Sequence, residues 1–251
     1  MNVDSLNFPV CIAHRGVKEL FPENTLVSFQ AALKANAQMI ELDVALSADR
    51  QLVVIHDETL DRTTNSKGKV SEKPLEELRK LDAGAWFDPL FAGEKVPTLQ
   101  EVIDLVNKRC VLNIEIKKEY FEENDAADTI EKQVLQLIIE NDLLDYSIVS
   151  SFQIKYLQRL QKLNPDLNLA YISLEPVDQI CLDACLELRV FSWNAWHETL
   201  SKEQVDLIHR AGLKVLSFTI QTMEEYEKVQ AMGVDGIFAD NLPRFQPLVN
   251  V

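Results

Sequence analysis

Short runs rich in β-branched and aromatic residues alternate with helical patterns along almost the whole chain. Helical patterns occupy 25–36, 98–107, 126–141, 152–163, 177–186, 200–211 and 222–232. The runs expected to form strands are 9–14, 38–46, 51–56, 110–116, 147–151, 168–172, 189–193, 214–220 and 235–239. This alternation predicts repeated β–α units, which favour a parallel sheet wrapped by helices.

Two of these strands lie too close in sequence to be joined by a helix. Residues 38–46 and 51–56 are separated only by Ser47–Arg50, which predicts a hairpin. Without its return strand, eight β–α repeats remain in 251 residues, the size of a TIM (β/α)8 barrel. A doubly wound open sheet is the alternative fold, but no Gly-x-Gly-x-x-Gly motif follows any strand.

Residues 57–97 interrupt the alternation, immediately after the hairpin. This stretch is polar and carries one short helical pattern at about 74–81. We expect it to leave the barrel as an insertion that caps the mouth. The chain has no internal repeat, low-complexity segment or linker, so residues 1–251 are expected to form a single domain.

Charge and hydropathy exclude several classes of partner. Lys and Arg sum to 25 and Asp and Glu to 40, which gives a formal charge of −15. Such an acidic chain lacks the basic surface that nucleic acids and anionic lipids require. It has no apolar run near the length of about 18 residues that spans a bilayer, and its start does not resemble a signal peptide. We therefore expect a cytoplasmic protein without stable membrane insertion, whose cysteines are reduced thiols. The oligomeric state stays open.

Three carboxylates occupy positions where an apolar barrel interior would be the ordinary expectation. In a TIM barrel, functional groups gather at the carboxyl ends of the strands. Glu41 and Asp43 lie two apart on one strand and share a face, and Glu115 lies near the end of the strand at 110–116. Buried carboxylates need neutralising partners. Oxygen ligands of this kind indicate one divalent cation, Mg²⁺ or Ca²⁺.

Two histidines and two cations are expected beside these carboxylates. His14 and Arg15 end the first strand, and the predicted hairpin places Asp43 opposite roughly Ile55–His56. Lys117 shares a strand face with Glu115. Paired histidines suit general acid–base catalysis, and Arg15 and Lys117 suit a phosphate.

Each of these features also has a purely structural interpretation. A strand-end His is often just hydrogen-bonded, Glu-x-Asp occurs on solvated edge strands, and Glu-x-Lys forms internal ion pairs. Their conjunction at one rim favours a catalytic site.

The order of these residues resembles a known family, the glycerophosphodiester phosphodiesterases. The similarity covers about residues 9–245, including the insertion segment 82–102 and the SSF run at 150–152. It is carried by the motifs His14-Arg15-Gly16, Pro22-Glu23-Asn24-Thr25, Glu41-Leu42-Asp43-Val44, His56-Asp57 and Glu115-Ile116-Lys117.

The resemblance implies a TIM barrel that hydrolyses small-molecule glycerophosphodiesters to glycerol 3-phosphate and an alcohol. It implies a metal on Glu41, Asp43 and Glu115, and an acid–base pair formed by His14 and His56. Arg15 would then hold the phosphate, with Lys117 beside it. The resemblance does not say which histidine is the acid, or whether the glycerol 2-hydroxyl or water attacks.

Substrate contacts are less well defined. Where the family commonly has Trp-Thr-Val-Asn, this chain reads Phe218-Thr219-Ile220-Gln221, so we expect an altered alcohol or glycerol pocket lined by Phe218. Trp86 in the insertion either forms an apolar wall over the site or anchors the loop. Glu23-Asn24-Thr25 either caps a helix or contacts the site directly.

Three other functions compete with this interpretation. A lysophospholipase D would need an apolar groove, and the sequence shows no amphipathic membrane-binding helix. A catalytically silent phosphodiester-binding barrel would have lost a histidine or a carboxylate, and none is lost. A metal-dependent sugar-phosphate isomerase would not explain the order of the two histidine motifs.

Overall fold

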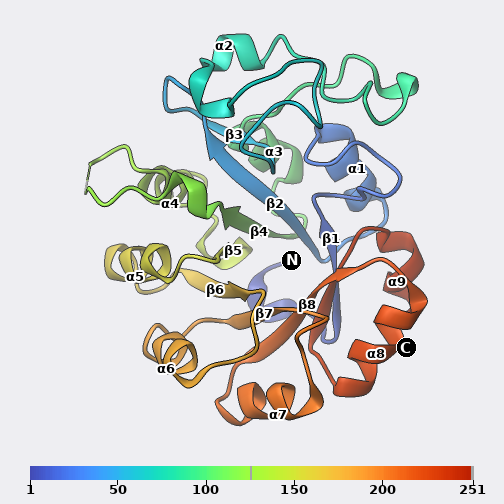
Figure 1. The fold of residues 1–251 in the computed structure, drawn as a ribbon, viewed down its shortest axis with the longest axis vertical. Coiled ribbons are helices and arrows are strands. Elements are labelled where there is room, and N and C mark those ends of the chain that lie inside the picture. Colours follow the sequence, from blue (N-terminus) through green and yellow to red (C-terminus); the bar gives the residue numbers. More distant parts are fainter. Residues whose placement is uncertain (125, 250–251) are drawn as a thin grey trace.

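The computed structural model describes residues 1–124 and 126–249, and residues 125, 250 and 251 of the expected domain lie outside the described part. Within it, eight parallel strands close into a TIM barrel in the order β1-β9-β8-β7-β6-β5-β4-β2, with β1 paired to β2 (Figure 1). These strands are β1 (Val10–His14), β2 (Met39–Leu46), β4 (Val111–Ile116), β5 (Ser147–Ser151), β6 (Asn168–Ser173), β7 (Ser192–Trp196), β8 (Lys214–Ile220) and β9 (Gly236–Ala239). The predicted fold is therefore confirmed.

Helices surround this barrel (Figure 1), and most match the predicted patterns to within a few residues. They are α1 (Leu26–Lys34), α2 (Leu75–Leu78), α3 (Leu99–Val106), α4 (Ile130–Glu140), α5 (Ile154–Leu163), α6 (Gln179–Glu187), α7 (Lys202–Arg210), α8 (Met223–Met232) and α9 (Leu242–Val249). Gly212 and Gly233 follow α7 and α8 with positive φ, as expected of glycines that end helices.

Two elements differ from the prediction. The strand expected at 189–193 is β7 (Ser192–Trp196), because α6 continues to Glu187 and Arg189 adopts a left-handed conformation that leaves no room for an earlier strand. Helix α9 has no counterpart among the expected helices. It contains Pro247, which argues against a helix locally, but Leu242 and Phe245 are fully buried, so tertiary packing overrides the local preference.

The hairpin has the predicted register. Strand β3 (Leu52–Val54) runs antiparallel to β2 with Val44 opposite Val54, and Ile55 donates its backbone N–H to the carbonyl of Asp43 at 3.0 Å. Side chains alternate across β2 as expected: Leu42 and its even-numbered neighbours face the helices. The odd-numbered side chains consequently face the barrel interior, where Glu41 and Asp43 lie near the carboxyl end.

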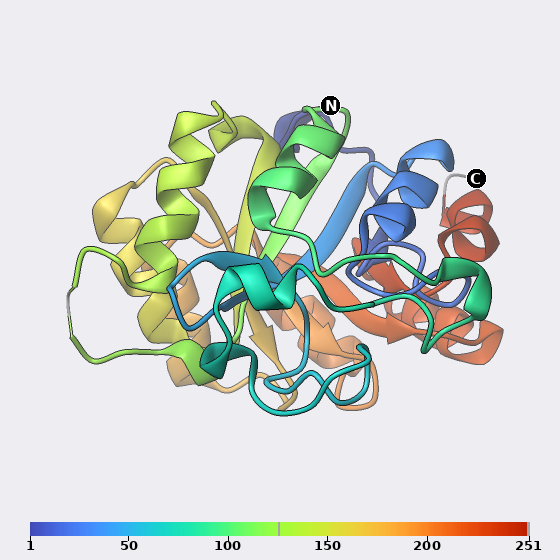
Figure 2. The same cartoon turned by 90° about the horizontal axis from the view of Figure 1, so that it is seen from above.

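The two ends of the barrel are filled differently. Towards the amino ends of the strands, the interior is apolar and is closed by Val3 and Leu6 of the N-terminal segment. The insertion lies at the opposite end from the N-terminus (Figure 2). It has a small core of its own, formed by Leu60, Val70, Leu78, Ala83 and Val96 against the hairpin residues Ala45, Val53 and Ile55. In the described part of the chain, no helix is long and apolar enough to cross a bilayer.

Candidate active site

A cavity opens at the carboxyl ends of the strands and collects most of the predicted site residues. One side of it is polar and charged, whereas the other is formed mainly by apolar side chains of β5 to β9. The lining residues are His14, Arg15, Glu41, His56, Asn113, Glu115, Lys117, Ser150, Phe152, Ile172, Leu174, Asn194, Phe218, Thr219 and Phe238.

The three predicted carboxylates converge at the edge of this cavity. Oxygen atoms of Glu41, Asp43 and Glu115 lie within 4.8 Å of one another. Their convergence follows from strand register, since β2 and β4 are neighbours and Asp43 pairs with Glu115. Glu41 Oε1 and Asp43 Oδ1 are buried and take part in no hydrogen bond with the described residues. This is a set of oxygen ligands suited to a hard cation.

Burial and mutual repulsion perturb these carboxyl groups strongly. Burial, together with the charges of Asp43 and Glu115, raises the pKa of Glu41 well above its usual value. Burial would also raise the pKa of Asp43, but the positive charges of Arg15 and Lys117 outweigh it and lower that pKa. The cluster therefore needs positive charge nearby to remain fully ionised.

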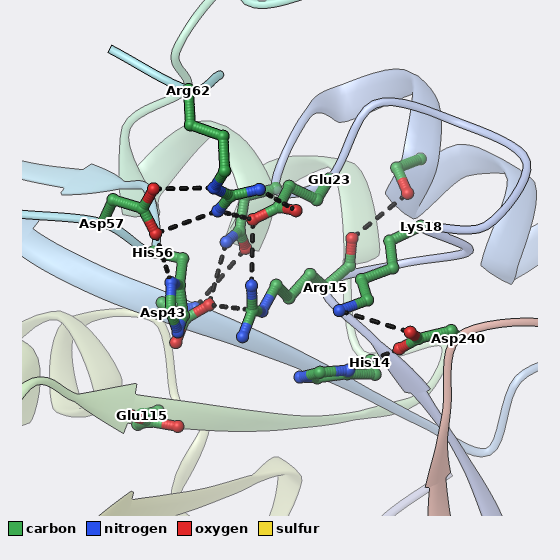
Figure 3. Close-up of polar contacts among 12 residues, drawn as sticks. His14, Arg15, Lys18, Glu23, Asp43, His56, Asp57, Arg62, Glu115 and Asp240 are labelled. Carbon is green, nitrogen blue, oxygen red and sulfur yellow. Dashed lines mark hydrogen bonds and ion pairs between the residues drawn. The ribbon is translucent and has the colours of Figure 1, made fainter. Parts of the chain in front are cut away.

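His14, at the end of β1, is held by a carboxylate that follows a different strand, β9. Its Nδ1 lies 2.7 Å from Asp240 Oδ1, directly after β9, while its Nε2 lies 3.9 Å from Glu41 Oε2 (Figure 3). An ionised carboxylate can only accept, so Nδ1 carries the proton and Nε2 is left as an acceptor. Burial and the charge of Arg15 lower the pKa of His14 to about 4.

His56 has the same arrangement on the opposite side of the cluster. Its Nδ1 lies 2.6 Å from Oδ1 of the adjacent Asp57, and its side chain lines the cavity. A hydrogen bond from Arg62 outweighs burial and lowers the pKa of Asp57 to about 2, which keeps it an acceptor. Both imidazoles thus present Nε2 as the ring nitrogen available for proton transfer.

Arg15 and Lys117 supply positive charge beside the acidic cluster. Arg15 Nε lies 3.2 Å from Asp43 Oδ2, and Lys117 Nζ lies 3.0 Å from Glu115 Oε1. The turn that aims Arg15 depends on Gly16, which has a φ of +84° and lies so close to α1 that a Cβ would meet Ser28 Oγ at 2.2 Å. This close approach explains the glycine of the His-Arg-Gly motif.

The Pro-Glu-Asn-Thr motif serves both of the roles left open by the sequence. Thr25 caps α1 by accepting from the backbone N–H of Ser28. Asn24 Nδ2 donates to Asp43 Oδ2 at 2.9 Å, and Glu23 Oε1 accepts from Arg15 at 3.0 Å. The motif therefore orients two site residues as well as starting a helix.

We predict that Glu23 makes the stability of the protein depend on pH. Burial opposes its ionisation, but hydrogen bonds from Arg62 and the charge of Arg15 lower the pKa of Glu23 to about 2, below the ordinary 4.5. Its contribution is complete above about pH 4.5 and is lost as the pH falls towards 2. Wild type should therefore exceed Glu23→Gln in unfolding free energy by a margin, at most about 3 kcal/mol, that shrinks between pH 5 and 3. A margin that is constant in urea titrations across this range would contradict the assignment.

The structure places Trp86 and Gln221 outside the described lining of the cavity. Trp86 is not among the described residues that line the cavity; its indole N–H donates to the carbonyl of Ala83, and its ring lies 6.0 Å from the Arg62 guanidinium. Both of these contacts lie within the insertion. Gln221 is also absent from that lining, and its amide donates to Asp240 Oδ2 at 2.6 Å. Phe218 lines the cavity as expected.

Sequence reasoning missed Asp240 and Arg62. Asp240 directly follows the last strand, so a search of every strand end for charged groups could have found it. Arg62 lies in the insertion and carries no strand or helix signal, so only the three-dimensional structure shows that it reaches the site.

Sequence comparison finds similarity to glycerophosphodiester phosphodiesterases over most of the chain. Residues 14–243 match the model of the "Glycerophosphoryl diester phosphodiesterase family". The YhdW protein of Bacillus subtilis is 41% identical over 231 residues, which cover 91% of this chain and 93% of that protein. The glycerophosphodiester phosphodiesterase of Caldanaerobacter subterraneus is 37% identical over 235 residues, covering 92% and 93%.

Structural comparison agrees with it. A phosphodiesterase of Oleispira antarctica, solved with its product sn-glycerol-3-phosphate, superposes with a TM-score of 0.85 at 29% identity, covering 97% of this chain and 98% of that one. The glycerophosphodiester phosphodiesterase of Agrobacterium tumefaciens gives a TM-score of 0.79 at 28% identity, covering 95% and 99%. This protein therefore belongs to the glycerophosphoryl diester phosphodiesterase family of enzymes.

Proposed function

We propose that this protein hydrolyses glycerophosphodiesters to glycerol 3-phosphate and an alcohol, using a bound divalent cation and proton transfer by His14 and His56. One observation carries the proposal: two imidazoles, each held at Nδ1 by a carboxylate, line the same cavity as an acidic cluster. This combination supplies the groups that phosphodiester cleavage needs, namely a base, an acid and positive charge.

The acidic cluster fits a divalent cation on chemical grounds. Glu41, Asp43 and Glu115 offer only oxygen, and two of their buried oxygens take part in no hydrogen bond with the described residues. Mg²⁺ and Ca²⁺ both prefer such ligands. When bound there, the cation would offset the negative charge that builds up on the phosphoryl oxygens.

The side chains around the cluster would bind the phosphate and transfer protons. Arg15 and Lys117 orient the phosphate by charge-assisted hydrogen bonds. One histidine takes a proton at its free Nε2 from the attacking hydroxyl. The other, which must carry a second proton at Nε2, donates that proton to the departing alkoxide as the phosphorus–oxygen bond breaks. The attacking group is either the glycerol 2-hydroxyl, which gives a cyclic phosphate first, or water. Detection of a transient cyclic phosphate would distinguish the two routes.

A lysophospholipid is the second candidate substrate, and the apolar side of the cavity favours it. Phe152, Ile172 and Phe218 line this side together with Leu174, which is 48% exposed. An acyl chain could cover these side chains, whereas a short polar alcohol would leave them in water.

The location and organisation of the protein also belong to the proposal. The four free cysteines, Cys11, Cys110, Cys181 and Cys185, support a reducing compartment such as the cytoplasm. We further infer that the barrel and the insertion act as one catalytic unit, since Arg62 of the insertion bonds to Glu23 beside α1.

Product analysis tests this function. Glycerophosphocholine and lysophosphatidylcholine would be incubated separately with the protein and Mg²⁺ or Ca²⁺, and the products identified by mass spectrometry. We expect glycerol 3-phosphate and choline from the first substrate. Turnover of the lysolipid alone would favour the second candidate, and binding of both without turnover would indicate a silent barrel.

A further inference from the structure

Arg62 joins the insertion to both sides of the site through a single guanidinium group. Its Nε and Nη2 donate to the two oxygens of Asp57 at 2.7 and 2.9 Å. Its Nη1 and Nη2 donate to the two oxygens of Glu23 at 2.8 Å each. Figure 3 shows the guanidinium lying between these carboxylates. Four donated hydrogen bonds to two anions fix its plane with respect to both.

Each of these two carboxylates also binds a residue with a proposed role in the reaction. Asp57 Oδ1 lies 2.6 Å from Nδ1 of His56, and Glu23 Oε1 accepts from Arg15 Nη1 at 3.0 Å. Arg15 in turn lies 3.2 Å from Asp43. Arg62 therefore stands at the centre of a continuous series that begins at an imidazole and ends at the acidic cluster.

The backbone that carries Arg62 is well anchored, although its side chain is 43% exposed. Leu60 is fully buried in the small core of the insertion, and its carbonyl accepts from both the backbone N–H and the hydroxyl of Thr64. The ring of Trp86 lies 6.0 Å from the guanidinium carbon on a further side. A residue whose backbone is held in this way can keep the groups that it binds in fixed positions.

We propose that Arg62 is a positioning residue, which fixes the His56 imidazole through Asp57 and the Arg15 guanidinium through Glu23. The proposal rests on the function proposed above. It gives the insertion a specific role, because the insertion backbone holds one planar group that aligns two site residues from different β–α loops. Arg62 is not among the described residues that line the cavity, so it acts through its partners and not on the substrate.

A merely stabilising ion pair is the competing explanation, and the chain offers a matched control. Arg79 belongs to the same insertion and also forms a two-pronged pair, with Glu101 in the first turn of α3. Among the described residues, no hydrogen bond or ion pair joins Arg79 or Glu101 to the lining of the cavity. Arg79→Gln likewise removes a two-pronged arginine–carboxylate pair and should leave kcat and KM for glycerophosphocholine within about twofold of wild type.

The decisive comparison is between Arg62→Gln, Arg62→Lys and Arg79→Gln. Loosening the imidazole should lower kcat of Arg62→Gln on the order of 10- to 100-fold, and loosening Arg15, which is assigned to the phosphate, should raise KM by a smaller factor. Lysine keeps the charge but lacks the planar fork, so Arg62→Lys should recover kcat only in part. Asp57→Asn combined with Arg62→Gln should lose little more than the more damaging single variant, because both act through His56.

Several outcomes would overturn the proposal. These are equal kcat for Arg62→Gln and Arg79→Gln, a defect confined to KM, full recovery in Arg62→Lys, or multiplicative losses in the double variant. Ring-nitrogen NMR signals of His56 provide a test that does not depend on turnover. They should shift in Arg62→Gln and stay unchanged in Arg79→Gln, and unchanged signals in both would also reject the proposal. If the wild type were inactive but the His56 signals still shifted in Arg62→Gln, the proposed function would be refuted and the positioning role of Arg62 would stand.

Discussion

Glu41→Ala and Glu115→Ala should each lose metal-dependent hydrolysis while remaining folded. Each removes one of the three proposed ligands, whose oxygen atoms lie within 4.8 Å of one another, so the cation would be bound weakly or in the wrong position. A bound metal ion contributes several kcal/mol to a transition state of this kind, so we expect kcat to fall on the order of 10³-fold. Steady-state kinetics at saturating Mg²⁺ or Ca²⁺ would measure the loss.

Stability should change far less than activity. Burial and its neighbours raise the pKa of Glu41, so its charge is unfavourable in the metal-free protein. We expect Glu41→Ala to unfold within about 1 kcal/mol of wild type without metal, since the hydrogen bond lost is that from the Arg15 amide. Exposed Glu175 lies outside the cavity, and Glu175→Ala serves as a control for loss of a charge. Full activity of either ligand variant after metal removal and refilling would contradict the metal site.

His14→Asn and His56→Asn should each lower kcat by about 10²- to 10⁴-fold, the usual contribution of one general acid or base. KM should change little, because the phosphate contacts are assigned to Arg15 and Lys117. The two variants differ in which limb of the pH–rate profile they remove, so profiles of kcat against pH would also show which histidine is the acid.

His209→Asn is the matched control for this pair. His209 also lies 2.8 Å from a carboxylate, that of Asp235, but it belongs to α7 and is not among the described residues that line the cavity. It should retain the kcat of wild type. If His14→Asn or His56→Asn also retained it, that histidine would have no part in proton transfer.

The barrel was predictable from sequence because its signals are local and repeated. Strands and helices alternate with the periods that their geometry demands, and the short interval Ser47–Arg50 dictates a hairpin with Val44 opposite Val54. Helix α9 was not predictable in this way. Pro247 disfavours a helix there, and the stability of α9 comes from burying Leu242 and Phe245, which is a property of the assembled barrel.

In the site, too, strand alternation predicts some features, whereas others depend on contacts between residues that are distant in sequence. Alternation on β2 and β4 predicts that Glu41, Asp43 and Glu115 face inwards, and strand order then brings them together. The partner of His14 is 226 residues away in sequence, at Asp240. The role of Arg62 depends on how the insertion folds back on the barrel, which no periodicity encodes.

The most direct test of the central claim is glycerol 3-phosphate release from glycerophosphocholine by the EDTA-stripped protein, titrated with Mg²⁺ and with Ca²⁺. We predict no release after stripping and a saturable return of activity with at least one of the two ions. Equal release before stripping, after stripping and after refilling would contradict metal-dependent hydrolysis at the acidic cluster. Absence of release under every condition, from a folded protein, would contradict the proposed reaction itself.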